Sequence, residues 1–318
     1  MPSNTKPNIK KSWRRKLGMS LTPLCFGVIT WMAYKNPEAL TQLASLNSKT
    51  IALSSALLAL YFLVYSLRLQ SVVEFWAQCK IPKIHFLKVV IFGRLYNTLF
   101  PQLGFLYRGM TLKRDYGIEH SNYFGSQVAF GILDLTVNIL IFITVWVAYE
   151  KTFLLAALTF IGCGSAALFA FSKLRHFPLP ENNTKGKLIN WLKEFRTRCS
   201  DISQPGFYIP FFILSLFSLV LMTTIFSCYF DQISNPLSLP IIILFYTLYR
   251  ITFYISVTPG NLGLREVAFG FIGAGFGVPA AAAALIALSI RIQSYIILAI
   301  LALPLFFYDK GAKHETSN

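Results

Sequence analysis

Residues 207–230 read FYIPFFILSLFSLVLMTTIFSCYF, a long apolar stretch without one charged side chain. Residues 50–67 (TIALSSALLALYFLVYSL) and 152–172 (TFLLAALTFIGCGSAALFAFS) are equally free of charge. A helix that rises ~1.5 Å per residue needs about 20 residues to cross the ~30 Å hydrocarbon core of a bilayer. Strands of membrane barrels are shorter and alternate between polar and apolar residues, which these stretches do not. The sequence therefore predicts an all-α, polytopic membrane helical bundle.

The composition points the same way. Hydrophobic residues make up 55% of the 318 residues and charged residues only 13%, against roughly 25% charged in an average soluble domain. The net charge is +16, and the basic residues gather at the edges of apolar blocks, chiefly in residues 1–17 and 173–206. This distribution is typical of cytoplasmic segments that face anionic lipid headgroups. We therefore expect an inner-membrane protein with a cytoplasmic N-terminus, whose partner is the membrane and not nucleic acid.

The apolar blocks divide the chain into about six spans within a single membrane domain that covers residues 1–318. A polar C-terminal tail follows at 309–318. The predicted spans are residues 18–34, 50–67, 123–149, 152–172, 207–230 and 278–308.

Two further apolar segments, 86–107 and 239–277, are interrupted by PQLG and PGNLG. Basic residues flank the first segment on both sides, so we predict a re-entrant hairpin that enters and leaves by the cytoplasmic face. The second segment is predicted to enter from outside, and hairpins of opposite direction indicate an inverted repeat. The alternatives are eight spans, with both segments crossing, and the general abundance of Pro and Gly in membrane helices. The predicted break residues are Pro101, Gly104, Pro259, Gly260 and Gly263.

Ionisable residues inside the apolar blocks are the strongest functional signal, because each costs about 2.5–3.5 kcal/mol at mid-span. Asp134 is the one carboxylate deep in a clear span, so we expect it to have an arginine partner. Asp134 and Glu266 cannot neutralise the four arginines inside the apolar blocks, which are Arg94, Arg250, Arg265 and Arg291. A phosphate could do so, because it fits the forked donors of arginine well. The alternatives are that these charges only hold helices together, or that some of the arginines snorkel to an interface. With Arg108, which follows the first break, the candidate lipid- or anion-binding residues are Arg94, Arg108, Asp134, Arg250, Arg265, Glu266 and Arg291.

Catalytic and cofactor motifs do not accompany these charges. The four histidines lie in loops or tails, the five cysteines form no CxxC pair, and no phosphate-binding glycine loop is present. We therefore expect no catalytic residue, no metal site and no cofactor, and a protein that handles a lipid. The alternatives are a scaffold for envelope lipid or glycan synthesis and a membrane-embedded transferase.

Residues 257–294 (VTPGNLGLREVAFGFIGAGFGVPAAAAALIALSIRIQS) and 97–118 (NTLFPQLGFLYRGMTLKRDYGI) form two related motifs. Together with the span that contains Asp134, they resemble the flippase-like membrane domain of lysylphosphatidylglycerol synthases. The resemblance implies a translocation module without the soluble aminoacyl-transfer domain of those synthases. Its ligand would be an anionic phospholipid or a lipid-linked phosphate. A second copy of the chain and an envelope-synthesis enzyme are further partners to consider.

Overall fold

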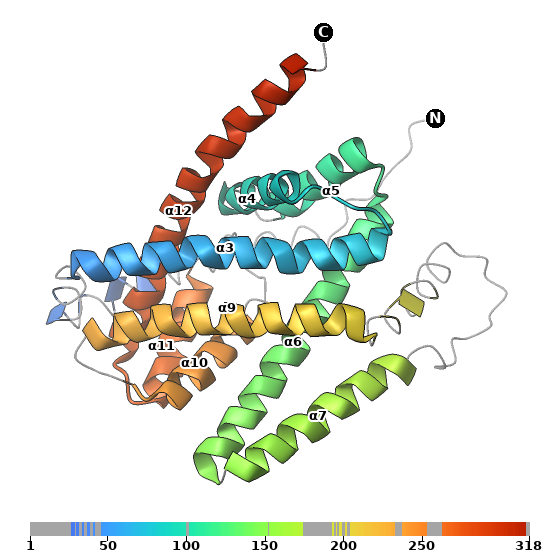
Figure 1. Ribbon diagram of the computed structural model, residues 1–318. Helices are drawn as coiled ribbons and strands as arrows, with labels where there is room; N and C mark the ends of the chain where they lie inside the picture. The colour runs from blue at the N-terminus through green and yellow to red at the C-terminus, as the bar shows by residue number, and fades with distance from the viewer. Residues whose placement is uncertain are drawn as a thin grey trace, which may run out of the picture.

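The computed structural model describes residues 46–99, 102–151, 153–173, 204–232, 237–252 and 263–315, with single residues between 27 and 41 and between 193 and 201. Within these residues the secondary structure is helical, without strands. The helices are α3 (Ser48–Ala77), α4 (Lys83–Leu99), α5 (Leu103–Tyr116), α6 (His120–Glu150), α7 (Phe153–Lys173), α9 (Pro205–Gln232), α10 (Leu239–Ile251), α11 (Leu264–Gly275) and α12 (Ala280–Glu315) (Figure 1).

Among the described residues, four helices are long and apolar enough to cross a membrane: Ser48–Ala77, His120–Glu150, Gly206–Gln232 and Ala280–Phe307. The first three contain the predicted spans 50–67, 123–149 and 207–230, the fourth covers most of the predicted span 278–308, and α7 nearly coincides with 152–172, which confirms the polytopic helical bundle. The predicted first span, 18–34, lies largely outside the described residues.

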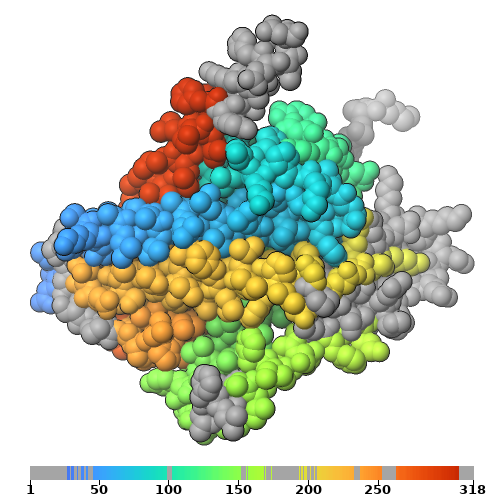
Figure 2. All heavy atoms as spheres, in the orientation of Figure 1, coloured from blue at the N-terminus to red at the C-terminus, as the bar shows by residue number. Residues whose placement is uncertain are grey.

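The outer surface of the bundle is apolar, as a lipid-facing surface must be. Helices α3 and α9 lie side by side across the face shown in Figure 2. Leu53 on α3 and Val220 on α9 are exposed, although large apolar side chains are buried in soluble proteins whenever possible.

Helices α4 and α5 form an antiparallel hairpin. At its open end the Tyr116 hydroxyl lies 2.8 Å from His85 Nδ1, and near its closed end Asn97 Oδ1 accepts a hydrogen bond of 2.8 Å from the Gly104 amide. Each step along α4 is thus matched by a step back along α5. With 17 and 14 residues, the two helices are about 26 and 21 Å long, so the chain returns to the side from which it came, as a re-entrant hairpin does.

The closed end of this hairpin depends on two glycines at a helix crossing. A Cβ atom on Gly104 would lie 1.6 Å from the Gly93 carbonyl oxygen, so a larger residue would push the two backbones apart. A glycine at a predicted break commonly supplies a positive φ angle, but here the positive φ belongs to Gln102, at 66°, and Gly104 is needed instead for the close approach of the two helices. Pro101 lies outside the described residues.

Helices α10 and α11 form the second antiparallel hairpin. The Phe269 ring of α11 packs 4.3 Å from Phe245 and 4.8 Å from Tyr249 of α10, centroid to centroid. Gly263 has a φ angle of 81° at the start of α11, which is the conformation that the predicted break requires there. The turn itself, residues 253–262 with Pro259 and Gly260, lies outside the described residues.

The two hairpins belong to two similar halves, α3–α6 and α9–α12. Helix α6 packs on α10 and α9, while α12 packs on α4 and α3, and α3 packs on α9. Such reciprocal contacts arise when two similar units are related by a two-fold axis. In Figure 1 the α4–α5 hairpin lies toward the end of the bundle where α3 ends and α9 begins, whereas α10–α11 lies toward the opposite end. This arrangement is that of an inverted repeat.

Candidate functional site

A cavity of about 750 Å³ lies between the two hairpins and the long helices. Its lining contains five arginines and one aspartate, together with neutral polar and aromatic side chains. The charged lining residues come from six different helices, one from each: Arg94, Arg108, Asp134, Arg250, Arg265 and Arg291. The structure therefore brings together every predicted charged residue except Glu266, which lies next to the cavity.

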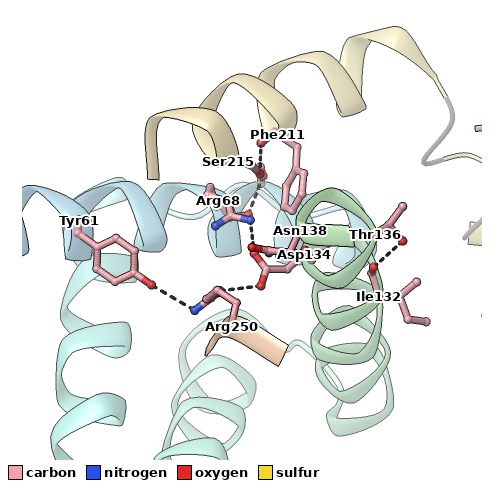
Figure 3. Close-up of polar contacts among 10 residues, drawn as sticks. Tyr61, Arg68, Ile132, Asp134, Thr136, Asn138, Phe211, Ser215 and Arg250 are labelled. Carbon is pink, nitrogen blue, oxygen red and sulfur yellow. Dashed lines mark hydrogen bonds and ion pairs between the residues drawn. The ribbon is translucent and has the colours of Figure 1, made fainter. Parts of the chain in front are cut away.

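Asp134 is held between two arginines. Its two carboxylate oxygens each lie 2.6 Å from a guanidinium nitrogen, one of Arg68 and one of Arg250 (Figure 3). Arg250 also reaches the Tyr61 hydroxyl, at 3.4 Å. All three charged side chains are buried, and the triad connects α3, α6 and α10. Removing one partner from such a buried group leaves an uncompensated charge, which typically costs about 3–5 kcal/mol.

Arg68 was missing from the predicted site. The predicted span ends at residue 67, one residue before Arg68. In the structure α3 continues to Ala77, and the Arg68 guanidinium lies over the rings of Phe130 and Phe211, at 5.4 and 4.9 Å from their centroids. A signal was available, because apolar residues continue at helical spacing through Val72 and Trp76.

Glu266 has a structural position behind the cavity wall. One of its carboxylate oxygens lies 2.9 Å from Arg291 Nε, and the other accepts a hydrogen bond of 2.8 Å from the Gly263 amide. The side chain therefore caps the start of α11 and connects it to α12. Arg291, in contrast, contributes to the cavity lining.

The two arginines of the first hairpin have partners of a different kind. The Arg94 guanidinium lies 3.8 Å from the centroid of the Tyr65 ring and 5.2 Å from that of Phe62. Arg108 is buried, and its Nε donates to the Gly104 carbonyl oxygen at 3.2 Å. Among the described residues, neither forms an ion pair with a carboxylate. Aromatic faces and carbonyl oxygens stabilise a guanidinium without neutralising it, so this wall of the cavity favours an anion.

Groups of three or more histidine, cysteine, aspartate or glutamate side chains that could hold a metal ion do not occur among the described residues. The neutral polar lining residues include Asn97, Gln127 and Ser294, and aromatic rings such as Phe105 and Phe226 complete the wall. Such a mixture suits a ligand with a polar head and an apolar tail.

Comparison with known proteins identifies one family. A family model described as the lysylphosphatidylglycerol synthase TM region matches residues 17–302, a range that contains both hairpins and every charged residue of the cavity. Neither a curated protein nor a solved structure matches the chain.

Proposed function

Since this chain belongs to the family of lysylphosphatidylglycerol synthase transmembrane regions, we propose that it binds an anionic or phosphate-linked lipid and moves it between the two leaflets of the membrane. The proposed location is a bacterial-type inner membrane, with the basic segments 1–17 and 173–206 in the cytoplasm.

The excess of arginines in the cavity is the observation that carries this proposal. Five arginines and one aspartate line about 750 Å³; that aspartate is already shared between Arg68 and Arg250, and Glu266, behind the wall, pairs with Arg291. With Arg68 included, six arginines therefore meet two carboxylates. In a low-dielectric site such an excess of positive charge is costly unless an anion enters. A phosphate would gain charge-assisted hydrogen bonds worth roughly 1.5–3 kcal/mol each.

The position of the cavity supports translocation rather than binding alone. It lies between two hairpins that point toward opposite ends of the bundle. Transporters built from inverted repeats place their substrate sites at the interface of the repeats, where rocking of one half exposes the site to alternate sides. A lipid headgroup held there would be reachable from each leaflet in turn.

A scaffold is the second candidate function, favoured by the Arg68–Asp134–Arg250 triad and the Arg291–Glu266 pair. These ion pairs connect helices without needing a ligand. The two functions differ in their dependence on Arg94 and Arg108. Lipid binding requires the positive charges of these two residues, whereas the ion pairs of a scaffold do not include them.

Leaflet exchange of fluorescent phosphatidylglycerol in vesicles that contain the purified protein tests the proposal. We expect faster exchange than in protein-free vesicles, and at least a tenfold lower rate for Arg94→Gln and for Arg108→Gln. Lys113→Gln is the matched control, because it removes a positive charge from the exposed side of α5. Unchanged exchange in both cavity variants would exclude the anionic-lipid function and favour the scaffold.

A further inference from the structure

The two halves of the bundle can be aligned residue by residue at the glycines that end α5 and α11. Gly117 and Gly277 both have left-handed backbones, with φ angles of 69° and 81°. Each is followed by a buried aliphatic residue and then by the long final helix of its half. Counting seventeen residues onward leads to Asp134 in α6 and to Ser294 in α12.

The arginines of the two hairpins correspond in the same way. Arg94 follows Gly93, whose added Cβ would lie 2.7 Å from the Arg108 side chain, nine residues before Gly117. Arg250 follows Tyr249, whose ring packs on Phe269, eight residues before Gly277. Within one residue, Arg94 and Arg250 therefore occupy equivalent places in their hairpins.

Equivalent pairs of helices make equivalent contacts, but the charges differ. Helix α10 packs on α6, where Arg250 meets the Asp134 carboxylate at 2.6 Å. Helix α4 packs on α12, where Arg94 and Ser294 both line the cavity. The second half therefore has a neutral serine at the place where the first half has a carboxylate.

The residue of the second half that corresponds to Arg68, the third member of the triad, is also neutral. Arg68 lies nine residues before the end of α3, and nine residues before the end of α9 stands Thr223. Thr223 is buried and donates its hydroxyl to the Leu219 carbonyl oxygen at 2.9 Å. The triad of Arg68, Asp134 and Arg250 lies where α3 and α6 of the first half meet α10 of the second. At the equivalent place, where α9 and α12 of the second half meet α4 of the first, Arg94 alone of the three corresponding residues carries a charge.

From this asymmetry we infer that the phosphate of the bound lipid occupies, between Arg94 and Ser294, the place that the Asp134 carboxylate fills in the other half. The inference rests on the proposed function and assigns the position of the anion. Arg291 lies one turn before Ser294 on the same face of α12 and also lines the cavity. Its Nε is held by Glu266 at 2.9 Å, so it adds positive charge beside this position.

The chemistry of the two anions explains why a phosphate can take the place of a carboxylate. Carboxylates and phosphates both present pairs of oxygens that match the forked donors of arginine. A carboxylate that belongs to the chain holds Arg250 permanently, whereas an anion that belongs to a ligand can arrive and leave. The small Ser294 side chain leaves room for the phosphate. Its hydroxyl donates to the Ile290 carbonyl oxygen at 2.7 Å and would donate to the phosphate after rotation about its side-chain torsion.

Substituting Ser294 with aspartate tests the inference, because the new carboxylate would compete with the phosphate for Arg94. Ser294→Asn is the matched control, with nearly the same shape and no charge. The measurement is the shift in unfolding temperature of the purified full-length protein on titration with short-chain phosphatidylglycerol and, separately, with inorganic phosphate. We expect S294D to weaken binding at least tenfold and to raise the unfolding temperature without ligand, while S294N stays within about threefold of the wild type.

The other possible results of these titrations also support or overturn the proposed position of the phosphate. Wild-type affinity in S294D, or no shift of the wild-type protein with either ligand, would overturn the inference. Binding of phosphate but not of phosphatidylglycerol, lost in S294D, would support the anion position and contradict the lipid function. If S294D does not fold, Arg94→Gln decides: it should weaken binding at least tenfold, and unchanged binding would overturn the inference.

Discussion

At the scale of single residues, the partners of each buried charge decide whether it stabilises the fold or is available to a ligand. Asp134 and Glu266 are both buried and both use their two carboxylate oxygens, so they act inside the protein. Arg94 and Arg108 rest on aromatic and backbone groups. We interpret the first pair as structural and the second pair as available to a ligand, although Asp134, Glu266 and Arg94 all came from the same argument about the cost of charge in hydrocarbon.

Asp134→Asn tests the structural role of the triad. An asparagine keeps the shape but leaves two guanidinium groups close together without their counter-ion, so we expect the free energy of unfolding to fall by about 3–5 kcal/mol. The measurement is thermal or denaturant unfolding of the purified protein in detergent. Asp231→Asn is the control, because Asp231 is exposed near the end of α9. Equal stability of the two variants would show that the triad contributes nothing to the fold.

At the scale of helices, the two hairpins determine where the cavity lies. Their helices are too short to cross the membrane individually, and tight contacts hold each pair together, through Gly93 and Gly104 in the first and through Phe245 and Phe269 in the second. Helix α4, which carries Arg94, packs on α12, and α10, which carries Arg250, packs on α6. The first hairpin was predicted from basic residues on both of its flanks, and its antiparallel register agrees with that reasoning.

Cysteine accessibility tests the direction of the first hairpin. Lys80→Cys and Lys113→Cys, in a background without native cysteines, stand before and after the hairpin at exposed positions. We expect both to be shielded from an impermeant thiol reagent added to intact cells, because both flanks face the cytoplasm. Lys151→Cys, exposed in the turn between α6 and α7, is expected to react from outside. Labelling of K113C under the same conditions would favour eight spans.

At the scale of the whole molecule, an inverted repeat surrounds one cationic cavity. The two halves share their helix order and their contacts, but their charges differ. Such an asymmetry lets the contact of α6 with α10 carry a fixed ion pair, while the equivalent contact of α12 with α4 binds an exchangeable anion. The ligand selectivity of the protein should follow from the balance of charge in this cavity.

Headgroup selectivity tests that balance. Among the described residues, Asp134 is the one carboxylate that lines the cavity, and two arginines already share it; an ammonium group on the headgroup would therefore find no counter-ion there and would be repelled. We expect phosphatidylglycerol to bind at least tenfold more tightly than phosphatidylethanolamine of the same chain length. Tryptophan fluorescence or unfolding shifts during lipid titration measure the ratio. Equal affinities would contradict a cavity that selects its ligand by net negative charge.

The helical spans after residue 50, the two broken segments and the buried charges other than Arg68 could be predicted from the sequence, because span length, charge placement and proline–glycine breaks are local properties of the chain. The tertiary structure alone decided the partners. Asp134 pairs with Arg68 and Arg250, which lie 66 and 116 residues away, and Glu266 pairs with Arg291 although Arg265 is its neighbour. Partner choice depends on which helix faces pack together and where each side chain points, and neither can be read from a single stretch of sequence.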